Sequence, residues 1–122
     1  MKEVLEFLKN GTFYLSTIEN NKPKTRPFGA IMEFENKLYF VTSNTKEVFK
    51  QIIQNQNICI CACAENRKWI RIQGIAKQDN RIIAKQKMLN DNPILLQRKR
   101  YTCAEDKTMA IFYIDDMTFE FN

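Results

Sequence analysis

The stretch LYFVTSNTKEVFKQI, residues 38–52, changes from a strand-like to a helix-like pattern within a few positions. An apolar run ends at Thr42, small polar residues occupy positions 43–45, and Lys46 follows. Apolar side chains then recur at helical spacing, so we expect a helix over residues 45–54. Two explanations fit this junction. Either one of residues 43–45 caps the helix, or the helix N-terminus binds an anion.

Segments with strand-like alternation lie on both sides of this junction, and short turns separate most of them. Gly74 stands inside one such segment, which indicates a β-bulge or a barrel corner. Short strands joined mainly by hairpins predict a mainly β protein with some helix, folded as a small antiparallel barrel. The expected strands span residues 12–18, 25–34, 38–42, 57–64, 69–78, 108–114 and 117–121, with turns at 19–24, 35–37 and Asp115–Asp116, and the expected helices span 3–9, 45–54 and 80–98, with a break near Pro93.

The composition of the 122 residues fits one compact domain over residues 1–122. Hydrophobic residues make up 44%, and only three glycines and three prolines are present, so we expect no flexible linker. No apolar run approaches the roughly 20 residues of a membrane-spanning helix. The charged start MKEVLEFLKNG differs from a signal peptide, and we expect a cytoplasmic protein.

The formal net charge is +5 and the pI is about 9.1, which favours anionic partners such as nucleic acids or phosphorylated small molecules. Histidine is absent. This excludes histidine-ligated zinc and haem, and also the Ser and Cys nucleophiles that depend on a histidine base. If the protein is an enzyme, we therefore expect a cofactor to carry the difficult chemistry.

Three cysteines, Cys59, Cys61 and Cys63, occupy alternate positions of one expected strand. Their side chains share one face, on which neighbours two positions apart are poorly placed for a disulfide. Their spacing also differs from the C-x2-C turns usual in zinc sites, and only Cys103 remains as a fourth thiol. We therefore expect no metal, and reduced thiols that act as small apolar residues in a strand buried on both faces.

The order of these segments resembles the pyridoxamine 5'-phosphate oxidase-related family of FMN-binding split barrels. The resemblance runs over nearly the whole chain and rests on the Arg-Pro pair at 26–27, the YFVTS…K junction at 39–46 and the Trp-x-Arg-x-x-Gly pattern at 69–74. It implies a homodimer that holds FMN between its subunits. True pyridoxamine phosphate oxidases carry a C-terminal motif with Arg and His for their substrate. This histidine-free sequence lacks that motif, so we do not expect that reaction.

The resemblance gives the junction a role in binding the phosphate of FMN. Thr42 and Ser43 would donate hydroxyl groups to the phosphate or the ribityl chain, and Lys46, in the first helical turn, would add a positive charge to the helix N-terminus. Arg26 would contribute a guanidinium fork to the same phosphate. The alternative is that Lys46 is a surface residue beside an ordinary cap.

Four further residues are candidates for contacts with the flavin. Pro27 and Phe28 would flank the flavin ring, or else pack as ordinary strand residues. Trp69 and Gln73 share one strand face with Arg71, and in the resembling family the equivalent strand approaches the cofactor from the other subunit. The alternative for this face is half-exposed barrel surface.

These features predict an FMN-dependent oxidoreductase that passes hydride or electrons between a reduced nicotinamide and a small molecule. No catalytic acid or base can be assigned, so an FMN-binding protein for electron transfer or flavin storage is an alternative, as is a related deazaflavin in place of FMN. A third reading is a basic single-strand nucleic-acid binder on an OB-like barrel, with Tyr39, Phe40 and Trp69 stacking on bases. It leaves the Thr-Ser-Lys junction unexplained, and we therefore expect no nucleic acid.

Overall fold

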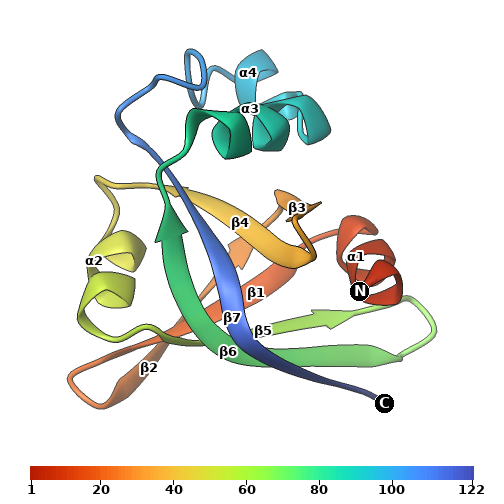
Figure 1. Cartoon of the computed structure of the whole chain (residues 1–122). Coiled ribbons are helices and arrows are strands. Elements are labelled where there is room, and N and C mark those ends of the chain that lie inside the picture. The colour runs from red at the N-terminus through yellow and green to blue at the C-terminus, as the bar shows by residue number, and fades with distance from the viewer.

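The computed structural model describes residues 1–122 and contains one seven-stranded antiparallel sheet with four helices (Figure 1). The strand order is β2-β1-β5-β6-β7-β4-β3. Only residues 29 and 30 separate the two edge strands, so the sheet curls into a split barrel that is open between them, as predicted. The strands are β1 (Phe13–Glu19), β2 (Lys22–Phe28), β3 (Ile31–Phe34), β4 (Lys37–Ser43), β5 (Asn57–Cys63), β6 (Trp69–Asp79) and β7 (Met109–Phe121), and the helices are α1 (Lys2–Lys9), α2 (Glu47–Gln54), α3 (Ile82–Asp91) and α4 (Ile94–Gln97).

Two hairpins close through two-residue turns in the left-handed region. Asn20–Asn21 join β1 to β2, and Glu35–Asn36 join β3 to β4, with φ between 52° and 62°. Such turns match the right-handed twist of the flanking strands. The first turn is shorter than expected, since β2 already begins at Lys22. The strand expected over 25–34 is in fact two strands, because the chain crosses at Gly29–Ala30 from one sheet edge to the other.

The long strands β6 and β7 slip in register at Gly74, so the bulge or corner predicted there is confirmed. A Cβ atom on Gly74 would collide with Ile114 Cγ2 and lie 2.8 Å from the carbonyl oxygen of Asp115. The turn predicted at Asp115–Asp116 is wrong, because β7 continues through it as one strand. Asp116 has a φ of 52°, and β6 pairs with β7 on both sides, so the two aspartates form a kink within the strand.

Two apolar clusters lie on the two sides of β4 and β7. One fills the barrel interior and includes Leu8 of α1 and Ile52 of α2, neither more than 1% exposed. The other lies between the outer side of β3, β4 and β7 and the segment from α3 onward, with Met88 and Tyr101 as members. Burial on both faces accounts for the almost unbroken apolar sequences of β4 and the first half of β7.

Strand β5, by contrast, is not buried on both faces, so that expectation is wrong for the single chain. Ile60 and Ala62 point into the barrel, whereas Cys59 is half-buried and Cys61 and Cys63 are exposed on the outer face. The cause is the placement of the helices. Helix α3 packs on β3, and α2 packs on β1 and β4, which leaves the outer face of β5 open (Figure 1).

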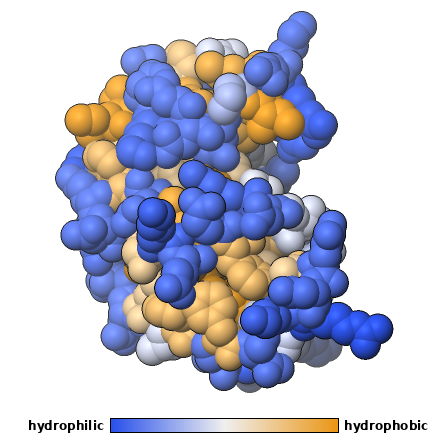
Figure 2. Space-filling view, turned by 90° about the vertical axis from the view of Figure 1, so that its right-hand side faces the viewer, coloured by the Kyte–Doolittle hydropathy of each residue, from blue (hydrophilic) through white to orange (hydrophobic).

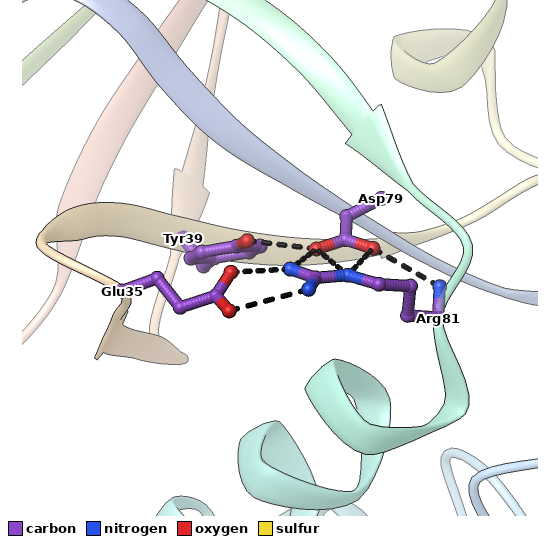
Figure 3. Close-up of polar contacts among 4 residues, drawn as sticks. All are labelled: Glu35, Tyr39, Asp79 and Arg81. Atoms are coloured by element: carbon purple, nitrogen blue, oxygen red, sulfur yellow. Dashed lines mark hydrogen bonds and ion pairs between the residues drawn. The ribbon is translucent and has the colours of Figure 1, made fainter.

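A polar network fixes the start of α3 to the barrel (Figure 3). The Tyr39 hydroxyl donates to Asp79 Oδ2 over 2.7 Å, and Arg81 Nη2 donates to the same oxygen over 2.8 Å. Arg81 Nη2 also donates to Glu35 Oε1 over 2.6 Å. The hydrogen bonds from Arg81 lower the pKa of Asp79 to about 2, and burial together with Asp79 raises the pKa of Tyr39 to about 12. The network thus joins the β3–β4 turn, β4 and the end of β6 to α3.

The helical region expected over 80–98 is divided as predicted, because Pro93 separates α3 from α4. Residues 98–108 then run back toward the barrel, where β7 begins. None of the four helices is both long enough and apolar enough to cross a membrane.

Candidate functional site

Arg26 points toward the barrel interior, because it pairs with the inward-facing Leu15 of β1. Its half-buried guanidinium donates from Nη1 to the Leu15 carbonyl (3.2 Å) and to Thr17 Oγ1 (2.9 Å), and from Nη2 to Gln51 Oε1 (2.6 Å). All three acceptors are neutral, and Arg26 belongs to none of the ion pairs. Burial lowers the pKa of this guanidinium. Arg26 therefore holds a partly desolvated positive charge without a counter-charge from the chain.

The sequence patterns did not single out the two side chains that hold Arg26. Thr17 and Gln51 are 1% and 4% exposed, and the Thr17 hydroxyl donates to Gln51 Oε1 over 2.5 Å. Thr17 continues the inward positions of Phe13 and Leu15, and Gln51 follows Val48 by three residues on the apolar face of α2. The signal in the sequence was thus a polar residue at an inward-facing position among apolar ones, because a buried polar group needs a hydrogen-bonding partner.

The start of α2 differs from the expected one. The helix begins at Glu47, two residues later than predicted, and Lys46 is its N-cap residue, with φ −92° and ψ 154°, instead of a first-turn residue. No side chain makes a capping hydrogen bond to the helix, so ordinary capping does not explain the junction. Thr42, at 4% exposed, offers little surface to a ligand. The exposed residues at this end of the helix are Asn44, Thr45, Lys46 and Glu47, and the first backbone N–H groups of a helix have no partner within it.

The residues before Lys46 do not cap the helix because the segment after α4 holds them. The hydroxyl oxygens of Ser43 and buried Tyr101 lie 3.2 Å apart. The Asn44 side chain donates to the carbonyl of Lys107 over 2.9 Å, and the Asn44 backbone N–H donates to that of Thr108 over 2.9 Å. These contacts fix the exit from β4, so that neither Ser43 nor Asn44 caps α2.

Helix α2 connects the two candidate phosphate ligands through its own residues. Lys46 stands at its N-terminus, and Gln51, which holds Arg26, follows five residues later, about 7.5 Å along the axis. Lys46 is exposed and forms no ion pair, whereas Lys50 pairs with Glu47 at 3.7 Å. The arrangement combines a free ammonium, a guanidinium held by neutral groups and a helix N-terminus, and each of these favours an anion.

The two residues after Arg26 point in opposite directions. Phe28 is half-buried, and its ring packs on Phe13 and Phe40 with centroid distances of 6.0 and 5.8 Å. Pro27 is exposed on the outer face of the barrel, where it pairs with Tyr14. Phe28 is therefore part of the core packing, and Pro27 is the residue of this pair whose side chain is open to solvent.

Trp69, Arg71 and Gln73 share the outer face of β6, as the alternation predicts. The Arg71 guanidinium lies 5.0 Å from the Trp69 ring centroid and pairs with Glu120 at 2.6 Å. Gln73 is exposed between Cys59 and Thr118 on the neighbouring strands. Arg26 faces the other side of the sheet. Within one chain, the structure therefore does not bring Trp69 and Gln73 together with the residues around α2.

The stacking surface expected of a nucleic-acid binder is not formed. Tyr39 and Phe40 are 1% and 0% exposed and belong to the two apolar clusters, so that expectation is wrong for both residues. They are covered because α3 and α4 lie over one face of β4 and the barrel interior over the other.

A surface hollow lies at another place in the barrel, between α1 and the turn from β5 to β6. Figure 2 views this side of the molecule and shows an apolar area framed by hydrophilic side chains in the lower half of the view. Phe7 packs on Phe121 there with a centroid distance of 5.9 Å, and Phe119 and Phe121 are 49% and 45% exposed. The hollow is lined by Phe7, Asn10, Gly11, Thr12, Ala62, Cys63, Ala64, Glu65 and Asn66.

The family described as "Pyridoxamine 5'-phosphate oxidase like" matches residues 1–95. The chain belongs to this family, which confirms the resemblance seen in the sequence. A search of curated proteins found no match.

Solved structures with the same fold include a NimC/NimA family protein from Clostridium acetobutylicum, which is 39% identical with a TM-score of 0.91, over 99% of this chain and 83% of that one. General Stress Protein 26 from Bacillus anthracis is 24% identical with a TM-score of 0.76, over 99% and 96% of the two chains. A pyridoxamine 5'-phosphate oxidase-related, FMN-binding protein from Nostoc punctiforme is 18% identical with a TM-score of 0.71, over 96% and 76%.

Proposed function

We propose that residues 1–122 form one FMN-binding domain, with the FMN phosphate at the N-terminus of α2. The observation that carries the proposal is Arg26, a half-buried cation held by three neutral acceptors and lacking a carboxylate partner. Lys46 adds a second unpaired cation at the same helix. A half-buried charge needs a counter-charge, which a phosphate dianion would supply to Arg26, and the exposed Lys46 would add a second cation to the same anion. Family membership and the FMN-binding relative of the same fold support this choice of anion.

We further propose that the site is completed in a homodimer. The barrel interior is filled by an 18-residue apolar cluster, so a ligand as large as FMN has to lie against the outside of the barrel. There a second surface is needed to keep water from the ring. Trp69 and Gln73 lie on the opposite side of the sheet from Arg26, so a partner subunit is the way in which they would reach the same flavin, with Pro27 beside its ring.

The proposed activity is transfer of hydride or electrons between a reduced nicotinamide and a small molecule, in the cytoplasm. When bound, the flavin supplies the redox chemistry. The roles of the chain are to bind the phosphate through Arg26 and Lys46, with Ser43 and Thr42 nearby, and to orient the ring system. The sequence contains no histidine, so the proposed site relies on binding and orienting the flavin.

The test is the visible spectrum of the purified protein after reconstitution with excess FMN and removal of free ligand. We expect bound flavin with bands near ~370 and ~450 nm. Mass measurement of the released chromophore distinguishes FMN from a deazaflavin. Reduction of the bound flavin by a nicotinamide separates an oxidoreductase from a storage protein. A protein that stays colourless and binds no FMN would overturn the proposal.

A further inference from the structure

We infer that Gln51 and Thr17 are positioning residues that hold Arg26 through neutral acceptors, so that its positive charge and one edge of its guanidinium remain available to an anion with two oxygens. This inference rests on the proposed function, because it concerns the same phosphate site, but it assigns roles to two residues that do not touch the ligand.

The side chains of Arg26, Thr17 and Gln51 form a closed triangle of hydrogen bonds. Gln51 Oε1 accepts from Thr17 Oγ1 at 2.5 Å and from Arg26 Nη2 at 2.6 Å, while Thr17 Oγ1 accepts from Arg26 Nη1 at 2.9 Å. Thr17 has one proton and gives it to Gln51, so its oxygen is left to accept from the guanidinium. Since Thr17 and Gln51 are 1% and 4% exposed, these two groups are fixed by the surrounding core.

The hydrogen bonds of Arg26 show which N–H groups of its guanidinium remain without an acceptor. A guanidinium has five N–H groups. Nη1 uses both of its hydrogens, for Leu15 and Thr17, and Nη2 uses one, for Gln51. Nε–H and the second hydrogen of Nη2 have no acceptor in the chain. These two lie on the same edge of the guanidinium and form the fork that binds two oxygens of a phosphate or carboxylate.

The two other arginines whose side chains make hydrogen bonds are neutralised by carboxylates, whereas the exposed Arg67, Arg98 and Arg100 form no ion pair. Arg71 pairs with Glu120 at 2.6 Å, and Arg81 pairs with Glu35 and Asp79 at 2.6 and 2.8 Å. At Arg26, the neutral side-chain amide of Gln51 takes the place of these carboxylates. A glutamate at position 51 would have the same shape as Gln51 and would bind Arg26 more strongly, but it would cancel the charge that an anion needs. The amide thus selects for an external anion over an internal ion pair.

The decisive variant is Gln51→Glu, and Gln54→Glu is its matched control. Gln54 is exposed on the same helix, so the control makes the same chemical change and the same change in net charge without touching Arg26. Titrations with FMN, riboflavin and inorganic phosphate are compared, the last by thermal shift. We expect Gln51→Glu to weaken FMN binding about 10- to 100-fold, to abolish the stabilisation by phosphate and to leave riboflavin binding within about twofold. The control should match the parent protein with all three ligands.

Thr17→Val is the second variant, in case Gln51→Glu does not fold. It removes the hydroxyl that links Arg26 to Gln51 while keeping the shape, and we expect FMN to bind a few-fold more weakly with riboflavin unchanged. Equal losses for FMN and riboflavin, or no loss in either variant, would overturn the inference and leave the proposed function standing. If the parent binds phosphate but not FMN, and Gln51→Glu removes that binding, the inference holds and the proposed function falls. If the parent binds neither ligand, both fail.

Discussion

Single residues near α2 decide which ligand the site can take. Lys46 stands at the N-cap position of α2, exposed and without an ion pair, while the half-buried guanidinium of Arg26 donates to Gln51 of the same helix. A cation at a helix N-terminus is unfavourable for the helix dipole unless an anion lies between them. The proposed phosphate would explain both residues, and the contribution of each can be measured separately.

Replacing Lys46 by Ala should weaken FMN binding about 10- to 100-fold, because charge-assisted hydrogen bonds contribute about 1.5–3 kcal/mol each. Riboflavin has no phosphate and should lose little. Lys50→Ala is the control, since Lys50 is one turn further along the helix and pairs with Glu47. Fluorescence titration measures both ligands. An equal loss of FMN and riboflavin affinity would show that Lys46 does not contact the phosphate.

Asp79 should make stability depend on pH at the acid end. Its folded pKa of about 2 lies below the ordinary value of 3.8, so it stabilises the fold fully above about pH 4, and the stabilisation is lost as the pH falls through about 2. We expect Asp79→Asn to lower the Tm by roughly 5–10 °C at pH 7, with a difference that shrinks toward pH 2. Thermal unfolding of both proteins at several pH values tests this. A constant difference at every pH would mean that the charge of Asp79 is not the cause.

At the scale of elements, the kink shared by β6 and β7 shapes the barrel. The register shift at Gly74 and the left-handed Asp116 opposite it bend the two longest strands together. The bend lets one continuous β7 pair with β4 in its first half and with β6 along most of its length. Without it, the long strands could not curve around the filled interior.

Gly74→Ala should therefore destabilise the protein by about 2–3 kcal/mol, because the added methyl group meets Ile114 and the backbone of Asp115. Gly29→Ala is the matched control. Its Cβ would have no neighbour within 4 Å, and we expect a change of less than ~1 kcal/mol. Urea denaturation measures both. Similar midpoints for the two variants would show that the bulge accommodates a side chain.

At the scale of the whole molecule, the barrel has one covered side and one open side. Helices α3 and α4 cover β3, β4 and β7, whereas the outer face of β5 and β6 exposes Cys61, Cys63 and Gln73 and leaves Trp69 half-buried. Trp69 and Gln73, two of the residues proposed to contact the flavin, lie on this open face. The same face is therefore the candidate for contact with a second copy of the chain.

FMN should stabilise the dimer, because a ligand held between subunits binds the dimer better than the monomer. Sedimentation across a dilution series should show dimers persisting to lower protein concentrations with FMN than with riboflavin. Labelling of Cys61 by a small thiol reagent should slow in parallel, since its exposed thiol would be covered. A protein that stays monomeric at high concentration yet binds one FMN tightly per chain would contradict this assembly.

Two wrong predictions show where local sequence patterns are insufficient: the burial of the three cysteines and the turn at Asp115–Asp116. Alternation predicted correctly that the three cysteines share a face, but not that this face is open in the single chain, since no local pattern tells where the helices pack. Asp115–Asp116 has the composition of a turn, yet β6 supplies hydrogen bonds on both sides and holds the pair within a strand. In both cases, packing or pairing with segments far away in the sequence decided the structure.

Sequence patterns alone were enough to predict most of the strands and helices, the break at Pro93 and the bulge at Gly74, because periodicity, proline and glycine act over a few residues. The split-barrel family followed from the resemblance of these segments and their order to a known family. The sequence also pointed to Arg26 and Lys46 as candidates. Only the tertiary structure decided that Lys46 precedes the helix, that Tyr101 and the following loop hold Ser43 and Asn44, and that Thr17 and Gln51 hold Arg26. Those contacts join segments tens of residues apart in the chain, and hydrogen bonds between such segments depend on how the whole barrel packs.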